Sequence, residues 1–398
     1  MAINILDNID LRQLGQQLQQ ARKKAGLTQA DAAKLIDAAR TTLVAIEKGE
    51  RRLKPTELIK LARAYRCAVS DFVHSAPAVE PLTVQFRMAY QKDSQSSNDI
   101  DATVERFETF CRYYRELEQI MNAPLPRNDP PEYNVKGMPI DEMAKSLAAK
   151  ERQRLGLGDG PIPRLRDVLE QSVGLRIFYL AMPSTKHSYS GLYSYSEELG
   201  GCIAINVNHP EERRRWSLAH EYLHFLAHRR KTIVDYDNQY QRKPESEKLA
   251  DSFADHFLMP SSGLLNQFTD IRQAQNKFTP TNLFTLAHYY GVSIAALTQR
   301  LESMKLLPSG TGKRLIDRGL KVRKVQQELG LEELPQRTDV VPLHYQHLAI
   351  EALDQGLITE GRFAIFLGVD RLEARRIAET LREYSSGEED AQLDLLEA

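Results

Sequence analysis

Apolar residues recur every three or four positions along most of this chain, a spacing typical of amphipathic helices. In the first 66 residues the repeat is interrupted at Gly26, near Asp37 and at Gly49, which predicts a compact bundle of four or five short helices. The later segment 100–121 carries an aromatic stripe, which predicts a buried helix face or a dimer contact. Other segments with helical spacing are 140–155, 162–171, 216–228, 245–258, 283–290, 292–301 and 350–382.

Three short segments before residue 216 carry the β-branched and aromatic residues typical of strands. They are 175–180, 191–195 and 202–206. Because they directly precede the helix predicted at 216–228, we expect a small sheet beside that helix. The expected fold class is therefore α+β and mostly helical.

Length and charge suggest more than one domain. A chain of 398 residues is too long for one ordinary core and suggests two or three domains. The net charge is −1, but residues 1–75 carry +5 and the remainder carries −6. Such asymmetry is expected when a nucleic acid binds the N-terminal part.

Cysteine usage and hydropathy point to a cytoplasmic protein. Cys67, Cys111 and Cys202 are scattered and form no CxxC pair, which favours a reducing compartment. The chain has no signal-peptide pattern and no apolar run of about 18 residues. We expect neither export nor membrane insertion.

The N-terminal bundle contains a helix-turn-helix pattern. Gly26 ends one predicted helix, Thr28 caps the next, and a turn near Asp37 leads into a third from residue 40. The phrases LTQADAA (27–33), RTTL (40–43) and IEKGER (46–51) resemble XRE-type repressor domains, including phage repressors. The resemblance implies that the domain binds a double-stranded DNA operator, usually as a homodimer.

The helix that begins at residue 40 would be the recognition helix. Arg40, Thr41 and Ala45, at or one turn beyond its start, would meet base edges. Phosphates would be held by Gln29, Lys48 and Lys54. The alternative is a bundle with the same scaffold that docks a protein.

The segment 216–228 contains the HExxH arrangement. His220 and His224 lie one helical turn apart on one face, so that both imidazoles can bind a single Zn²⁺. Glu221 lies beside them, close enough to take a proton from the attacking water. The alternative is a pair of hydrogen-bonded core histidines.

A third ligand is expected from the helix at 245–258. Beside the apolar stripe of this helix lies a second strip that contains Glu247, Asp251 and two alanines. The small alanine side chains would let the helix approach the HExxH helix closely. Glu247 would complete a His₂Glu site with an open fourth position, and Asp251 would orient a ligating imidazole. A rival ligand is His228, but a helix continued through it would carry that imidazole away from the metal. We therefore interpret His228 as the partner of a buried polar group or as a solvated helix end.

Several separated phrases resemble the ImmA/IrrE-type metallopeptidases. They are IAIN (203–206), RRRW (213–216), AHEYLH (219–224), EKLADSFA (247–254) and LMP (258–260). The resemblance implies a zincin-like fold of the gluzincin type, a zinc cofactor and a repressor-like or antitoxin-like protein substrate, with Mn²⁺ as the alternative metal. In such peptidases an edge strand can hold an extended peptide.

Two further groups surround the expected site. An oxyanion needs a donor opposite the metal, and the sequence does not choose among four candidates in or near the strands: His187, Tyr189, Tyr193 and Tyr195. The run 213–215 of three arginines is interpreted as a solvated charged face, or alternatively as a patch that steers an acidic substrate.

The expected organisation has five segments. These are an XRE-like DNA-binding domain (10–73), a linker with a long helix (74–139), an ImmA/IrrE-like metallopeptidase domain (140–305), a C-terminal helical region (306–384) and an acidic flexible tail (385–398). Within the C-terminal region, 357–372 resembles a helix-turn-helix only weakly and is interpreted as a helical hairpin.

We therefore expect a cytoplasmic DNA-binding regulator that carries a zinc-dependent endopeptidase. One alternative is a transcription factor whose HExxH domain senses a metal or ligand without catalysis. The other is an antitoxin or phage-defence protein that acts through protein interactions.

Overall fold

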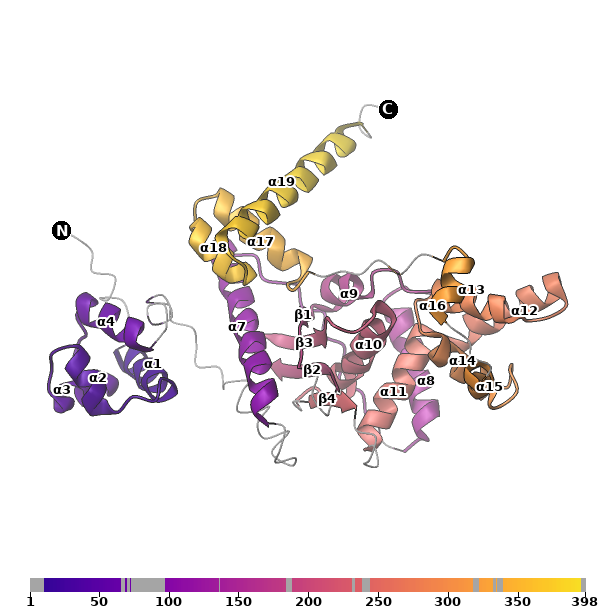
Figure 1. The fold of residues 1–398 in the computed structure, drawn as a ribbon, viewed down its shortest axis with the longest axis horizontal. Coiled ribbons are helices and arrows are strands. Elements are labelled where there is room, and N and C mark those ends of the chain that lie inside the picture. The colour runs from indigo at the N-terminus through magenta and orange to yellow at the C-terminus, as the bar shows by residue number, and fades with distance from the viewer. Residues whose placement is uncertain are drawn as a thin grey trace. The chain divides into compact units, whose positions relative to one another are not determined.

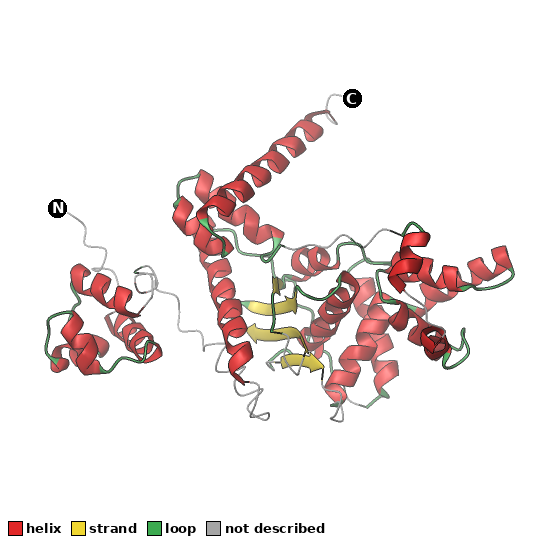
Figure 2. Ribbon diagram, in the orientation of Figure 1, coloured by secondary structure: helices red, strands yellow, loops and turns green. Residues whose placement is uncertain are grey.

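The structure is a computed structural model that describes residues 11–65, 69, 72, 97–135, 137–183, 188–230, 233–237, 244–317, 322–331, 334 and 339–394. The chain folds into two compact units, Met1–Val79 and Glu80–Ala398 (Figure 1). Helices dominate both units, and the strands form one sheet in the second (Figure 2). The predicted class, α+β and mostly helical, is confirmed. Within the described ranges, no helix is both long and apolar enough to cross a bilayer.

The first unit is a bundle of short helices: α1 (Leu11–Lys24), α2 (Gln29–Leu35), α3 (Arg40–Glu47) and α4 (Pro55–Tyr65). Thr28 caps α2 in a capping box with Asp31, which satisfies donors at the helix start. All four helices contribute buried apolar residues to one core. Beside that core, the Arg22 guanidinium of α1 binds the buried Glu47 carboxylate of α3 at 2.6 Å.

The second unit contains a four-stranded sheet in the order β1-β3-β2-β4. Strand β1 (Arg176–Leu180) runs parallel to β3 (Gly200–Asn206). Strand β2 (Ser188–Ser196) is antiparallel to both β3 and β4 (Ile233–Asp237). The first three strands match the predicted segments, except that β1 begins one residue later than predicted, whereas β4 was not predicted.

The second unit has helices on both faces of its sheet, and other helices lie away from the sheet (Figure 1). In chain order they are α7 (Ser97–Met121), α8 (Ile140–Arg154), α9 (Leu165–Val168) followed by a π-helical turn (Leu169–Val173), α10 (Glu211–Ala227), α11 (Glu245–Leu258), α12 (Ser261–Gln275), α13 (Pro280–Tyr290), α14 (Ile294–Ser303), α15 (Thr311–Asp317), α16 (Val322–Glu328), α17 (Leu343–Asp354), α18 (Glu360–Leu367) and α19 (Arg371–Asp394).

Alternating strand residues separate two cores. Ile177, Tyr193 and Ile203 pack on the face covered by α10, in a core to which α8 and α11 also contribute. Leu192 and Ala204 pack on the opposite face, covered by α7 and the C-terminal helices. Because successive strand side chains point to opposite faces, every inner strand is buried on both sides.

The C-terminal helices complete the second of these cores. The Tyr114 hydroxyl of α7 lies 2.9 Å from His344 Nδ1 of α17. Helices α18 and α19 lie in the segment where we expected a helical hairpin, and Gly368 (φ 67°) ends α18. Helix α19 continues to Asp394, so the backbone is helical over most of the segment that we expected to be a flexible tail.

A buried ion pair anchors α7 to the sheet. Arg176 of β1 donates to both carboxylate oxygens of Glu118 on α7, at 2.5 and 2.7 Å. Glu118 also accepts a hydrogen bond from the Leu125 backbone N–H at 3.1 Å. Either charge left alone in this core would be strongly destabilising.

Replacing Glu118 with alanine is expected to lower the free energy of unfolding of this unit by about 3–5 kcal/mol, because Arg176 would stay buried without its counter-ion. Trp216 is the only tryptophan of the chain, so its fluorescence during a urea titration reports on this unit. The control is Arg112→Ala, an exposed change on the same helix that should cost about 0.5 kcal/mol or less. Equal losses in the two variants would contradict the prediction.

Candidate metal centre and nucleic-acid interface

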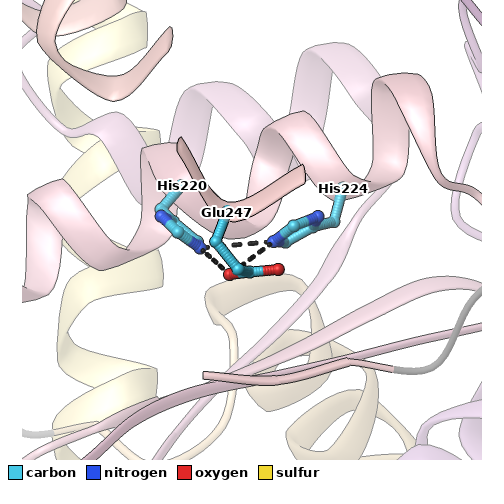
Figure 3. A group of neighbouring side chains, drawn as sticks. All are labelled: His220, His224 and Glu247. Atoms are coloured by element: carbon cyan, nitrogen blue, oxygen red, sulfur yellow. Dashed lines mark hydrogen bonds and ion pairs between the residues drawn. The ribbon is translucent and has the colours of Figure 1, made fainter. Parts of the chain in front are cut away.

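Helices α10 and α11 bring three donor side chains together (Figure 3). His220 and His224 come from successive turns of α10, and Glu247 comes from the first turn of α11. The two imidazole Nε2 atoms are 3.2 Å apart, and Glu247 Oε2 lies 3.1 Å from that of His220 and 3.6 Å from that of His224. Over the described part of the chain, this is the one group of His, Cys, Asp and Glu side chains found close enough to share a metal ion.

The spacing of these atoms fits a tetrahedral cation. With bonds of about 2.0–2.1 Å, neighbouring ligand atoms around a tetrahedral Zn²⁺ lie about 3.3 Å apart. The observed separations of 3.1, 3.2 and 3.6 Å bracket this value. A set of three protein ligands leaves the fourth position for water or substrate.

The charge state of Glu247 also suits a cation. Burial alone would raise the pKa of this carboxyl, but its hydrogen bonds with His220 and His224 outweigh burial and hold the pKa well below its ordinary value. The side chain is therefore an ionised carboxylate near neutral pH, as a metal ligand must be.

His220 is oriented through its second ring nitrogen. Its Nδ1 lies 3.0 Å from Asp251 Oδ1, one turn after Glu247 on α11. A carboxylate at this place holds the proton on Nδ1 and leaves the Nε2 lone pair for a metal. This contact is the one that we expected for Asp251.

Trp216 covers the same imidazole, and its role was missed by sequence reasoning. Its ring centroid lies 5.4 Å from that of His220, and its indole N–H donates to Asp255 Oδ1 at 3.2 Å. Burial raises the pKa of Asp255 to about 6. The available signal was spacing, since Trp216 precedes His220 by four residues and Asp255 follows Asp251 by four.

The side chain of Glu221, a residue of α10, points toward strand β2 and is fully buried. A Cβ atom at Gly191 of β2 would collide with the Glu221 carboxylate in its present position, so the glycine permits this close approach. The pairing of β2 with β4 is also irregular between Tyr189 and Gly191, as is common near active sites. Gly191 was missed as a site residue, although a glycine within a predicted strand is a signal of close approach.

The structure separates the oxyanion candidates without selecting one. Tyr189 packs in the core on the α7 face of the sheet. The Tyr193 ring lies 6.5 Å from that of His224, but its hydroxyl donates to the Arg229 carbonyl at 2.8 Å. The Tyr195 hydroxyl accepts a hydrogen bond from Arg127 at 3.2 Å. The fourth candidate, His187, lies outside the described residues.

The interpretation of Arg213, Arg214 and Arg215 as a solvated face was wrong. Arg214 is fully buried above the Tyr179 ring, 5.1 Å from its centroid, and pairs with Glu211 at 2.8 Å. Arg215 donates to two backbone carbonyls and Arg213 donates to a serine hydroxyl. These side chains fix the start of α10 to its neighbours because each guanidinium offers several donors to fixed acceptors.

Helix α10 does not continue through His228, contrary to our assumption. It ends at Ala227, and His228 has a non-helical backbone (φ −135°, ψ 36°). His228 Nδ1 lies 3.1 Å from Nδ1 of His224, the ring nitrogen not directed at Glu247. His228 is thus the partner of a buried polar group, one of the two roles that we expected.

In the first unit, the predicted DNA contacts surround α3. Arg40, Thr41, Lys48 and Lys54 are exposed, and Gln29 and Ala45 are half-buried. The Gln29 amide donates to Glu47 at 3.0 Å and accepts from Arg40 at 3.4 Å. Side chains held in this way lose less conformational freedom when they bind a ligand.

Comparison with protein families gives matches to two stretches of the chain. Residues 170–302 match the peptidase family described as "IrrE N-terminal-like domain", and residues 18–72 match the family described as "Helix-turn-helix". The predicted fusion of an XRE-type domain with an ImmA/IrrE-type domain is confirmed.

Comparison with whole proteins gave a solved structure of low similarity and no curated protein. The crystal structure of ComR from Streptococcus suis aligns with 97% of this chain and 96% of its own, at 10% identity and a TM-score of 0.16. No curated protein matches the chain.

Zn²⁺ added to the chelator-treated protein is expected to change the fluorescence of Trp216, because the indole ring lies against a proposed ligand, His220. Co²⁺ should bind the same ligands and quench the emission. Fluorescence titration checks both effects, with His220→Ala expected to remove them and the exposed-site variant His347→Ala expected to keep them. A wild-type protein that shows neither a fluorescence response nor bound zinc by elemental analysis would disprove the site.

Proposed function

We propose that this chain, which joins a helix-turn-helix domain to an IrrE-type peptidase-like domain, is a DNA-binding regulator that also cleaves a protein partner as a zinc-dependent endopeptidase. The convergence of His220, His224 and Glu247 beside Glu221 carries the proposal. A structural zinc usually has four protein ligands and needs no neighbouring base, whereas hydrolytic sites use three ligands and a base.

In this proposal each residue has a defined task. Zn²⁺, or Mn²⁺ in its place, would polarise the scissile carbonyl and make water more acidic. Glu221 accepts a proton from the water whose oxygen attacks the carbonyl carbon, and then gives that proton to the amine as the C–N bond breaks. Asp251 holds His220 in its ligating tautomer, and Gly191 leaves room for the Glu221 carboxylate.

The sheet supports a protein substrate. Strand β4 pairs with β2 along one side and lies at the edge of the sheet. Its other side can therefore pair with an extended peptide through backbone hydrogen bonds. By its resemblance to ImmA/IrrE-type enzymes, we propose a repressor or an antitoxin-like protein as that substrate.

The first unit would bring this activity to DNA. Its charge of +5 over residues 1–75 and its exposed basic residues around α3 support binding to a double-stranded operator, with two copies on a two-fold site. We place the protein in the cytoplasm, consistent with the free thiols of Cys111 and Cys202.

A second candidate function is favoured by the complete burial of the Glu221 side chain, because a general base must reach the attacking water. In this alternative the domain binds its metal as a sensor, without cleaving a substrate, and the chain is a transcription factor. The two functions differ in what they require, because a sensor needs the metal ligands but not Glu221.

Glu221→Gln is expected to retain zinc and to slow cleavage by about 10²–10⁴-fold, because an amide cannot accept the proton. Substrates would be identified by comparing the proteomes of cells that express the wild type or the variant, and the rates measured on the purified partner. Glu212→Gln, on the same helix, is the control and should cleave normally. Operator binding that survives Glu221→Gln but not His220→Ala, with no protein cleaved by the wild type, would favour the sensor.

Lys48→Ala and Lys54→Ala are each expected to weaken binding to all DNA sequences and to reduce the slope of log affinity against log salt by about 1, because each removes one phosphate contact. Arg40→Ala should instead cost about 1–3 kcal/mol on the preferred site and relax its sequence preference. Affinities would be measured by fluorescence anisotropy on sites selected with the wild-type protein. Arg63→Ala, an exposed change on α4, is the control, and a salt-independent interaction would contradict DNA binding.

A further inference from the structure

The geometry points to a further residue of the metal centre: we infer that His228 is a positioning residue that holds His224 in the tautomer needed to bind the metal. This inference rests on the proposed function, because it assumes that His224 is a ligand. It assigns a task to a histidine that is not itself within the ligand group.

The two ligand histidines are supported differently. His220 Nδ1 faces the Asp251 carboxylate. On α10 one turn later, His224 Nδ1 lies 3.1 Å from His228 Nδ1. The rings of His224 and His228 have their centroids 5.3 Å apart.

The proton positions follow from this arrangement. A ligand that binds metal through Nε2 must carry its proton on Nδ1, and a buried N–H donor needs an acceptor. His228 Nδ1 lies at hydrogen-bond distance from His224 Nδ1, and its lone pair can accept that hydrogen bond. His228 must then carry its own proton on Nε2, so the contact fixes the tautomers of both rings.

The end of helix α10 places His228 for this contact. The His228 backbone N–H donates to the His224 carbonyl at 2.8 Å, while its non-helical backbone turns the side chain out of the helical path. Arg229 holds this end from both sides: its guanidinium donates to the Phe225 carbonyl at 3.3 Å, and its own carbonyl accepts from Tyr193 at 2.8 Å. His228 is therefore fixed at both its backbone and its ring.

Two substitutions separate positioning from packing. His228→Leu keeps an apolar side chain of similar reach and removes the acceptor, whereas His228→Asn places an amide oxygen near the position of Nδ1. The zinc dissociation constant would be measured by competition with a chromophoric chelator, and the melting temperature would be measured on the zinc-free proteins. His228→Ala is measured in parallel, in case the leucine variant does not fold.

His228→Leu or His228→Ala is expected to weaken zinc binding by about 10–100-fold, the usual effect of removing the partner of a ligating histidine. His228→Asn should recover most of that loss, although the melting temperatures of the zinc-free variants need not follow the same order. Zinc affinity within twofold of the wild type in the leucine or alanine variant would overturn the inference. So would a loss in all the variants that follows the zinc-free melting temperature.

Failure of the inference and failure of the proposed function give different results. If the wild-type protein binds no zinc, the metal site is disproved, and so is the role of His228. If the wild-type protein and the leucine variant bind zinc equally tightly, only the role of His228 is disproved.

Discussion

The proposed metal centre depends on how closely and how rigidly helices α10 and α11 pack. Its three ligand atoms come from two helices, and metal sites tolerate deviations in bond length of only about 0.2 Å. Ala219 of α10 and Ala250 and Ala254 of α11 are fully buried in the shared core, and small side chains permit a close approach. A larger separation of the helices would move Glu247 away from both imidazoles.

Buried polar contacts fix these helices to the rest of the unit. The Tyr222 hydroxyl of α10 donates to Glu151 of α8, which also accepts from Tyr133 at 2.7 Å. On α11, His256 is held by Arg300 of α14 through a contact of 2.7 Å. Contacts of this kind are directional, unlike apolar packing, and so they restrict sliding of one helix along another.

Local periodicity explains how much of this site could be predicted from the sequence. His220, Glu221 and His224 lie within two turns of one helix, so helical spacing alone determines which of them share a face. Glu247 and Asp251 follow the same rule on the second helix, and the structure brings them to His220 and His224. The pairing of the two helices could be anticipated because the apolar stripe and the alanines of α11 mark its buried side.

The features that were missed depend on contacts between distant parts of the chain. Arginines are usually solvated, and the burial of Arg214 follows from Tyr179 on β1, which the local sequence does not reveal. The end of α10 is set by Arg229, which binds carbonyl groups of Phe225 and Pro130. Strand β4 is a short edge strand in a polar part of the sequence. Its strand conformation therefore depends on pairing with β2 more than on its own residue types.

The two-sided burial of the sheet has a consequence for the limits of the peptidase-like domain. The family match ends at residue 302, yet α7 and the helices after residue 340 cover the back of the strands that face α10. Leu192 of β2 belongs to that rear core, next in sequence to Gly191, which borders Glu221. The core of this unit therefore includes segments on both flanks of the recognised domain, and a single strand, β2, connects those flanking helices with the surroundings of Glu221.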